Sequence, residues 1–279
     1  MTTEYYRELT RRNTGLISAD TQLRLRRTTV LVAGCGSTGG AVIEPLARIG
    51  VGGMTLVEPG TYELNNLNRQ DAYIEDIGRN KAQTAATRVG RINPECQVSV
   101  HVDGITAANA DRIVRDSTIV VDGVDVTTRS GWHAKLAVHQ AAARHRLTVV
   151  SGWDLASSQY VRIYRYGVDR TLAPLGGLTP DDGDTLSVWS LIKRLVPSSA
   201  FPSALVDDIV DRGAREPEYS VPQLVQAALT FGAIVTQLVL NDANGISGPA
   251  EILVDLQYLT TGVPNTIASR AEQWFKSLP

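Results

Sequence analysis

Cysteine is scarce in this chain, because only Cys35 and Cys96 occur among its 279 residues. Two thiols are too few for a disulfide-stapled scaffold or for a zinc site built from four cysteines. There is no CxxC pair, so we expect no zinc. His133 and His139 fall on one expected helix without acidic or cysteine partners at metal-ligand spacing, and we assign them no metal role.

Long apolar runs are also missing from the sequence. No uninterrupted apolar stretch is long enough to cross a bilayer, and none precedes a cleavage site near the N-terminus. We therefore expect a cytoplasmic protein without a membrane partner. The chain carries 27 Lys and Arg against 29 Asp and Glu, a formal net charge of -2. This balance gives no support for a nucleic-acid partner.

Strand-like and helix-like runs alternate through the first half of the chain. Strands are expected at 29–34, 53–58, 97–102, 117–122 and 147–151. Helices are expected at 37–50, 78–92, 107–116 and 129–145. Strands interleaved with helices of this length predict right-handed crossovers and a parallel sheet covered on both faces. The fold class is therefore α/β, with a Rossmann-like, doubly wound sheet.

The pattern changes after residue 157. Residues 158–167 alternate strictly, with Tyr160, Tyr164 and Tyr166 on one face, which predicts an antiparallel strand with one wetter face. We expect a Gly-, Pro- and Asp-rich loop at 167–186. Helical runs are expected at 186–195, 204–212 and 221–241, and a last strand at 251–259. No linker is evident, so we predict one domain over 1–279. Within it we distinguish an arm at 1–27, a nucleotide-binding core at 28–152 and a substrate and dimer region at 153–279.

A glycine-rich turn joins the first expected strand to the first long helix. Gly34, Gly36 and Gly39 match GxGxxG, and Glu58 ends the next strand about 20 residues on. Glycines permit a tight turn and close approach of phosphate oxygens, which the helix N-terminus attracts. An acid at the position of Glu58 accepts ribose hydroxyls. The motif indicates a nucleotide but does not separate NAD, FAD and ATP.

Polar residues after the second expected strand distinguish among these nucleotides. The stretch "NNLNRQ" holds Asn66, Arg69 and Gln70, and Lys81 and Asp125 follow at the start of a helix and after the fourth strand. An oxidoreductase has no evident need for these groups. An enzyme that transfers AMP needs cations for departing pyrophosphate, for which Arg69 and Lys81 are candidates. Asp125 is a candidate ligand for Mg²⁺.

Four stretches together resemble the ThiF/MoeB/HesA superfamily, the bacterial relatives of ubiquitin-activating enzymes. They are "GCGSTGG", "LVEPGTYELNNLNRQ", "IGRNK" and "VVDGVDVTTR", followed by "LTVVSG". The similarity extends over about 13–163. It implies an adenylyltransferase that transfers AMP from ATP to the C-terminal carboxylate of a small ubiquitin-like protein or peptide. The product is an acyl adenylate.

The resemblance also assigns roles to individual residues. It implies that the turn of Gly34, Gly36 and Gly39 binds ATP and that Glu58 binds ribose. Apart from the resemblance, the Asn66 amide can donate to a phosphate, and we place Asn66 and Gln70 in the nucleotide site. The resemblance further implies that Arg69 and Lys81 hold phosphates and that Asp125 binds magnesium. In related dimers an arginine of the N-terminal arm reaches the partner's ATP, and Arg11 and Arg12 are the candidates here.

The sequence departs from the family pattern in three places. The two CxxC pairs that hold structural zinc in many members are absent. No cysteine follows Cys96, so we expect no thioester on the enzyme. The Asp-x-Asp that usually ends the second strand is replaced by Glu58, Pro59 and Gly60, so the second acid is missing.

Several alternatives remain open at this stage. A related ATP-dependent dehydratase or cyclase acting on a peptide side chain or a modified tRNA base would share the fold. An NAD-dependent oxidoreductase explains the glycines and Glu58 but leaves Arg69, Lys81 and Asp125 without a role. A scaffold that keeps ATP without chemistry is a fourth option. The tyrosine face and the long apolar run at 221–241 lead us to expect a homodimer.

Overall fold

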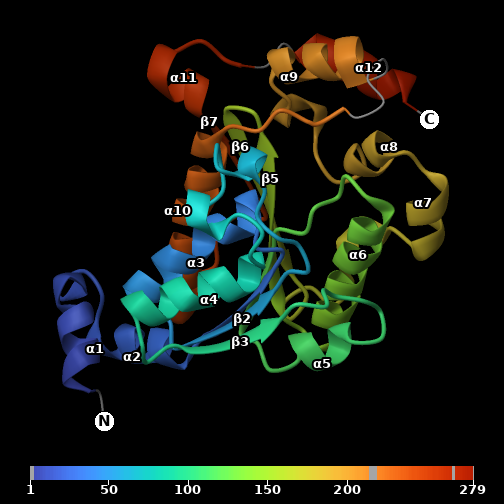
Figure 1. Cartoon of the computed structure of the whole chain (residues 1–279). Helices are drawn as coiled ribbons and strands as arrows, with labels where there is room; N and C mark the ends of the chain where they lie inside the picture. The colour runs from blue at the N-terminus through green and yellow to red at the C-terminus, as the bar shows by residue number, and fades with distance from the viewer. Residues whose placement is uncertain (1–2, 214–218, 266–267, 279) are drawn as a thin grey trace.

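β-Branched runs between glycines and polar turns form the strands of a single sheet. The computed structural model describes residues 3–213, 219–265 and 268–278, and in them seven strands follow the order β3-β2-β1-β4-β5-β6-β7 (Figure 1). The strands are β1 (Thr29–Ala33), β2 (Gly53–Val57), β3 (Gln97–His101), β4 (Ile119–Asp122), β5 (Thr148–Leu155), β6 (Ser158–Arg165) and β7 (Glu251–Asp255). The first five are parallel, which confirms the doubly wound α/β prediction.

The register of the parallel strands brings their carboxyl ends to one edge. Ala33 at the end of β1 lies opposite Val57 of β2 and Asp122 of β4. The residues that follow these three strands therefore meet at the same place. In open sheets of this kind, ligands bind at that edge where the strand order reverses.

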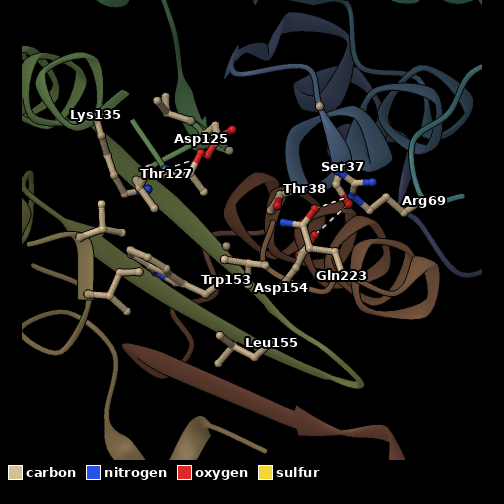
Figure 2. Close-up of a pocket in the computed structure, with 18 of the residues that line it drawn as sticks. Ser37, Thr38, Arg69, Asp125, Thr127, Lys135, Trp153, Asp154, Leu155 and Gln223 are labelled. Carbon is tan, nitrogen blue, oxygen red and sulfur yellow. Dashed lines mark hydrogen bonds between the residues drawn. The ribbon is translucent and has the colours of Figure 1, made fainter. Parts of the chain in front are cut away.

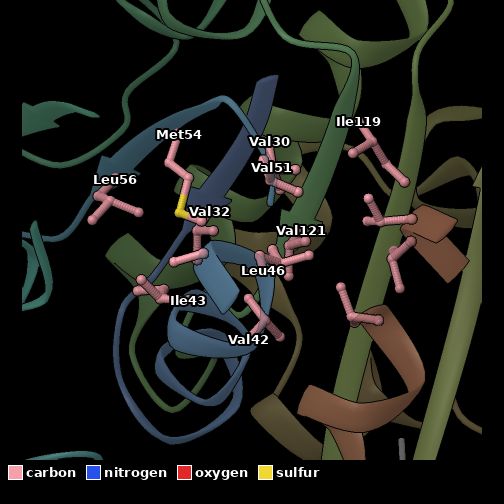
Figure 3. Packing of buried hydrophobic residues seen from close by; sticks show 14 of the residues in the cluster. Val30, Val32, Val42, Ile43, Leu46, Val51, Met54, Leu56, Ile119 and Val121 are labelled. Atoms are coloured by element: carbon pink, nitrogen blue, oxygen red, sulfur yellow. The ribbon is translucent and has the colours of Figure 1, made fainter. Parts of the chain in front are cut away.

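Helices cover both faces of the sheet (Figure 1). On one face lie α3 (Ser37–Ile49), α4 (Lys81–Ile92) and α10 (Val225–Ala243), and on the other lie α5 (Ala110–Val114) and α6 (Arg129–Arg144). Figure 3 shows the core under α3, where Val42, Ile43 and Leu46 pack against Val32 and Leu56 of the strands. The helix expected from residue 78 begins at Lys81, because the Asn80 side chain caps it.

The prediction of a wetter face on β6 is wrong. The strand is antiparallel to β5 and β7 as expected, but Tyr160 and Tyr164 are 2% and 1% exposed. Tyr164 packs under α5 and α6, and Tyr160 packs against the C-terminal helical region. Val161 and Ile163 on the opposite face lie in the core under α3 and α10. Elements distant in sequence thus cover both faces, which alternation within the strand cannot reveal.

The long apolar helix α10 is largely covered by the chain itself. Phe231, Val235 and Val239 are buried against α3 and the sheet. Leu229 remains exposed on the outer side. Most of the apolar face of α10 is therefore covered within the chain, and the homodimer expected from this helix stays a prediction.

The C-terminal region holds more helix than the sequence suggested. Residues 180–185, placed in a loop, form a capped helix, and the last strand ends at Asp255, whose side chain caps the helix that follows. The short helices of this region are α7 (Pro180–Thr185), α8 (Val188–Ile192), α9 (Ser203–Asp208), α11 (Leu256–Thr261) and α12 (Ala268–Ser277). At the other end of the chain lie α1 (Glu4–Leu9) and α2 (Ala19–Arg27).

Among the helices of the described residues, none combines the length and apolar character required to cross a bilayer. The division into arm, core and C-terminal region stays a prediction.

Candidate functional site

The glycine turn packs backbone against backbone at the carboxyl edge of the sheet. A Cβ on Gly39 would lie 1.8 Å from the Gly34 carbonyl oxygen, and one on Gly34 would lie 2.4 Å from that of Gly123. Gly34 also has a φ of +83°. Side chains at Gly34 and Gly39 are therefore excluded, and their absence lets the N-terminus of α3 approach the ends of β1 and β4.

A cavity of about 220 Å³ opens beside this turn. The predicted site residues that line it are Gly36, Glu58, Arg69, Gln70, Lys81 and Asp125. Gly34, Gly39 and Asn66 are not among its lining residues. In Figure 2, Ser37, Arg69, Asp154 and Gln223 gather on one side of this cavity, and Asp125 and Lys135 lie on the other. The fold thus brings together groups that lie far apart in the sequence.

Glu58 connects the two segments that begin the site. One carboxylate oxygen accepts the Cys35 N–H at 3.0 Å, and the other accepts the Gly60 N–H at 2.8 Å. The carboxylate therefore holds the glycine turn against the loop after β2. Each oxygen keeps a second lone pair for a further donor, so this role is compatible with binding ribose hydroxyls.

Arg69 is held in place by groups from two parts of the chain. Its guanidinium donates to the Asn65 carbonyl oxygen at 2.9 Å and to the Asn68 side chain at 2.7 Å. Its Nε also donates to the side chain of Gln223, which precedes α10. These bonds fix the orientation of a planar cation at the cavity wall.

Asn66 lies in the loop that carries Arg69 and does not line the cavity. The residue is buried, its Oδ1 accepts the Glu63 N–H at 3.1 Å, and its Nδ2 donates to Asn65 at 2.6 Å. Its amide is thus used to shape the loop that carries Arg69. Residue type alone could not separate these two uses of an asparagine.

Lys81 and Asp125 lie where helix and loop meet the cavity. Lys81 is the first residue of α4, and its ammonium lies 5.8 Å from the centre of the Tyr62 ring. Asp125 is exposed in the loop after β4, and its Oδ1 accepts the Thr127 N–H at 2.9 Å. The second carboxylate oxygen forms no hydrogen bond with the described residues. A carboxylate in this state is suited to a magnesium ion.

Asp154 faces the start of α3 from the end of β5. Its Oδ2 accepts a hydrogen bond from the Ser37 hydroxyl at 2.9 Å. Burial raises the pKa of this carboxyl, while Ser37, Thr38 and the charge of Arg69 oppose the shift. The polar groups around the cavity therefore include an acid beside the expected phosphate side.

A buried ionic network stands behind the cavity. Lys135 of α6 lies 2.5 Å from Asp122, which also accepts from Ser151 at 2.9 Å and lies 3.0 Å from His139 Nε2. Burial alone would raise the pKa of Asp122, but Lys135 and His139 lower it below its usual range. The ammonium of Lys135 also lies 4.8 Å from the Trp153 ring centre. The network ties the end of β4 to α6 and β5.

A second hollow of about 310 Å³ adjoins the first. The two share Glu58, Val124 and Asp125 in their linings. The second hollow extends between Pro59 and the 103–106 loop after β3. The two hollows therefore meet at Glu58, Val124 and Asp125, at the carboxyl edge of the sheet.

Neither cysteine is placed for chemistry at this site. Cys35 is fully buried inside the glycine turn, and burial raises the pKa of its thiol well above the ordinary value. Burial raises the pKa of Cys96 to about 11. Neither residue lines the cavity. Thiolates, the reactive forms, are therefore disfavoured at both positions.

The sequence pattern does not mark several polar residues that line the cavity, among them Ser37, Thr38, Lys135 and Gln223. Ser37 and Thr38 could have been found, because they open the helix that follows the glycine turn. Gln223 approaches Arg69 across 154 residues of sequence, so no local pattern marks it. Lys135 lies in the middle of α6, where a lysine normally indicates a solvated face.

Curated relatives match this chain over part of its length. The sulfur carrier protein ThiS adenylyltransferase of Bacillus subtilis is 31% identical over 162 residues, covering 57% of this chain and 44% of that protein. The tRNA threonylcarbamoyladenosine dehydratase of Haemophilus influenzae is 38% identical over 112 residues, covering 39% and 43% respectively. Both matches span less than half of the relative's length.

Solved structures match over nearly the whole chain. The crystal structure of PaaA has a TM-score of 0.67 at 19% identity and covers 92% of this chain and 82% of that one. Escherichia coli tRNA N6-threonylcarbamoyladenosine dehydratase, TcdA, in complex with ATP has a TM-score of 0.61 at 20% identity, with coverages of 88% and 97%. At these identities the likeness shows a shared fold.

The family comparison covers the site described above. The model of the ThiF family matches residues 10–182, a span that contains the glycine turn, Glu58, Arg69, Lys81 and Asp125. This span is more than half of the 279 residues. The chain therefore belongs to the ThiF family.

Proposed function

We propose that this protein transfers AMP from ATP to a carboxylate and releases pyrophosphate. The observation that carries the proposal is the convergence of Arg69, Lys81 and Asp125 on one cavity at the N-terminus of α3. Two cations and a candidate metal ligand at a helix N-terminus suit a polyphosphate. The ThiS adenylyltransferase relative supports the same chemistry.

The two adjoining hollows suggest how ATP lies. In this proposal the ribose contacts Glu58, where the hollows meet. The adenine occupies the hollow beside Pro59 and the 103–106 loop. The phosphates then extend past Gly36 toward Arg69 and Lys81. Gly36 leaves room there, because a Cβ at this position would approach Gln70 only to 3.7 Å.

In the reaction, a carboxylate oxygen attacks the α-phosphorus. A new P–O bond forms, the bond from that phosphorus to the oxygen bridging to the β-phosphate breaks, and pyrophosphate leaves with the electron pair. Charge grows on the departing group, and Arg69 and Lys81 stabilise it there. Asp125 would hold Mg²⁺, which supplies further charge neutralisation on the phosphates when it is bound.

The acyl substrate is proposed to be the C-terminus of a small ubiquitin-like protein or a peptide. Relatives named as adenylyltransferases for sulfur carrier proteins support this class. The buried thiols of Cys35 and Cys96 disfavour transfer of the acyl group to either cysteine. The acyl group therefore passes directly to an external nucleophile, which forms a bond to the carbonyl carbon while AMP leaves. The Haemophilus influenzae relative supports a second candidate, an ATP-dependent dehydratase acting on a modified tRNA base.

We also propose that the protein acts as a homodimer. Arg11 and Arg12 are exposed on the N-terminal arm and do not line the cavity of their own chain. A role for either residue at an ATP therefore requires a second copy. Light scattering at micromolar concentration should give twice the mass of one chain, and a mass near one chain would remove this role.

Calorimetric titration and ATP–pyrophosphate exchange test the proposed function. We expect binding of Mg²⁺·ATP and no comparable binding of NAD. Exchange should depend on a peptide or carrier-protein carboxylate. The Asp125→Asn variant keeps the Oδ1 acceptor for Thr127 but loses the charge, so exchange in this variant should need more Mg²⁺. Tight NAD binding without a response to ATP would contradict the proposal. An unchanged Mg²⁺ requirement in Asp125→Asn would contradict the role of Asp125.

A further inference from the structure

The cavity does not end at the phosphate side. It continues into an apolar chamber walled by Trp153, Leu155, Val188, Ile192, Phe201 and Leu205. Four of these side chains, those of Trp153, Leu155, Ile192 and Leu205, are between 2% and 7% exposed, and Phe201 is fully buried. Val188 is half-buried. The walls come from β5, from α8, from the segment that leads into α9, and from α9 itself.

Alternation along β5 separates the two ends of the cavity. Asp154 contacts Ser37 at the start of α3, whereas Trp153 and Leu155 belong to the cluster on the side of α6 and α8. Successive side chains of a strand point to opposite faces, so Asp154 lies on one face of β5, and Trp153 and Leu155 lie on the other. Figure 2 shows Trp153 and Leu155 on the far side of Asp154 from Arg69. Because one cavity includes residues of both faces, a group attached to the α-phosphate can extend past the end of β5 from the polar end to the apolar end.

The charge beside the chamber is already compensated. Lys135 is 1% exposed, pairs with Asp122 at 2.5 Å, and lies over the ring of Trp153. An uncharged apolar group placed against Trp153 would therefore not strip water from a free cation. A charged side chain would lose its hydration in the chamber and would gain no unpaired partner in exchange, because Lys135 is already paired with Asp122.

We propose that the acyl substrate carries a bulky apolar side chain, aromatic or branched aliphatic, on the residue whose carboxylate is activated. This inference rests on the proposed adenylyl transfer and specifies its substrate. A tail ending in glycines carries no side chain and would make no packing contact with these apolar walls. A phenylalanine- or leucine-sized group would pack against them.

Stable analogues of the acyl adenylate test the inference on the full-length protein. The probes are 5′-O-(N-acylsulfamoyl)adenosines whose acyl group is N-acetyl-phenylalanine, N-acetyl-leucine, N-acetyl-glycine or N-acetyl-glutamate. Calorimetry should show binding of the phenylalanine and leucine analogues at least about tenfold tighter than that of the glycine and glutamate analogues. Titration with Mg²⁺·ATP on the same sample tests the nucleotide site separately.

A matched pair of variants on neighbouring residues places the effect in the chamber. Val188→Phe fills space in the chamber and should remove at least about tenfold of the preference for phenylalanine over glycine, with ATP affinity unchanged. Leu186→Phe adds the same side chain at a half-buried position that does not line the cavity, and should keep the preference.

The outcomes separate the inference from the proposed function. If ATP binds but the glycine or glutamate analogue binds as tightly as the apolar ones, the inference is wrong and adenylyl transfer stands. If folded Val188→Phe weakens ATP as much as the analogues, the chamber belongs to the nucleotide and the inference is wrong. If wild-type protein does not bind ATP, the proposed function fails first. Should Val188→Phe not fold, the wild-type comparison decides alone.

Discussion

At the scale of single residues, Arg69 offers a direct test of the proposed reaction. Its guanidinium is held at the cavity wall by Asn65, Asn68 and Gln223. Arg69→Ala removes a preorganised cation from the side where pyrophosphate leaves. We expect a loss of roughly 10²-fold in ATP–pyrophosphate exchange, about 3 kcal/mol. The melting temperature without nucleotide should change little, because the residue is only partly buried.

Arg79→Ala is the matched control for this variant. Arg79 lies on the same segment between β2 and α4, but it lines a different hollow. Its removal changes the net charge equally and should leave exchange close to the wild-type rate. Equal losses in both variants would mean that overall charge, and not the position of Arg69, controls the rate. A wild-type rate in Arg69→Ala would contradict its assignment to the phosphates.

At the scale of secondary-structure elements, the contact between α3 and α10 depends on a glycine. A Cβ placed on Gly232 would lie 2.4 Å from the carbonyl oxygen of Ala41 in α3. The two backbones must therefore separate in Gly232→Ala. We expect destabilisation of about 1–3 kcal/mol, the usual cost of overpacking a core. Urea unfolding of the two proteins measures this difference.

Gly90→Ala provides the control for the helix effect of alanine. Gly90 is exposed in α4, and no atom lies within 4 Å of the position that its Cβ would take. Alanine in a free helix position should stabilise by about 0.5–1 kcal/mol. Opposite signs at the two glycines would locate the effect in the α3–α10 contact. A stabilised Gly232→Ala would mean that the helices are not this close.

At the scale of the whole molecule, the network behind the cavity makes stability depend on pH. His139 is fully buried, and desolvation lowers its pKa from 6.5 although Asp122 opposes the shift. Above pH 6.5 the imidazole is neutral in both the folded and the unfolded chain. As the pH falls below that value, the unfolded chain takes up a proton that the folded chain refuses. The free energy of unfolding should therefore fall, by up to about 1.4 kcal/mol per pH unit.

Urea unfolding between about pH 7.5 and about pH 5 measures this slope. His139→Gln should be less stable throughout, because it disturbs the bonds to Asp122 and Tyr166, but its slope over this range should be smaller. His101→Gln, which changes a half-buried position at the end of β3, serves as the control and should keep the wild-type slope. Identical slopes in all three proteins would show that His139 is not the titrating group.

The sequence by itself determined the fold class and most of the polar end of the site. Alternating strand and helix runs predicted the parallel strands, and Gly36, Glu58, Arg69, Lys81 and Asp125 line the cavity. The parallel strands and the convergence of these residues on one cavity have the same physical reason. Parallel strands bring their carboxyl ends to one edge, so residues that follow them converge whatever the rest of the chain does.

Only the tertiary structure decided which faces are covered and what completes the site. Tyr164 lies under α5 and α6, and Gln223 reaches Arg69 from a segment 154 residues away. The apolar chamber likewise combines β5 with α8, α9 and the segment before α9. A local sequence pattern indicates only the period with which side chains recur on one face of a helix or strand. Burial and side-chain pairing depend on which distant element packs there, and that is set by the fold as a whole.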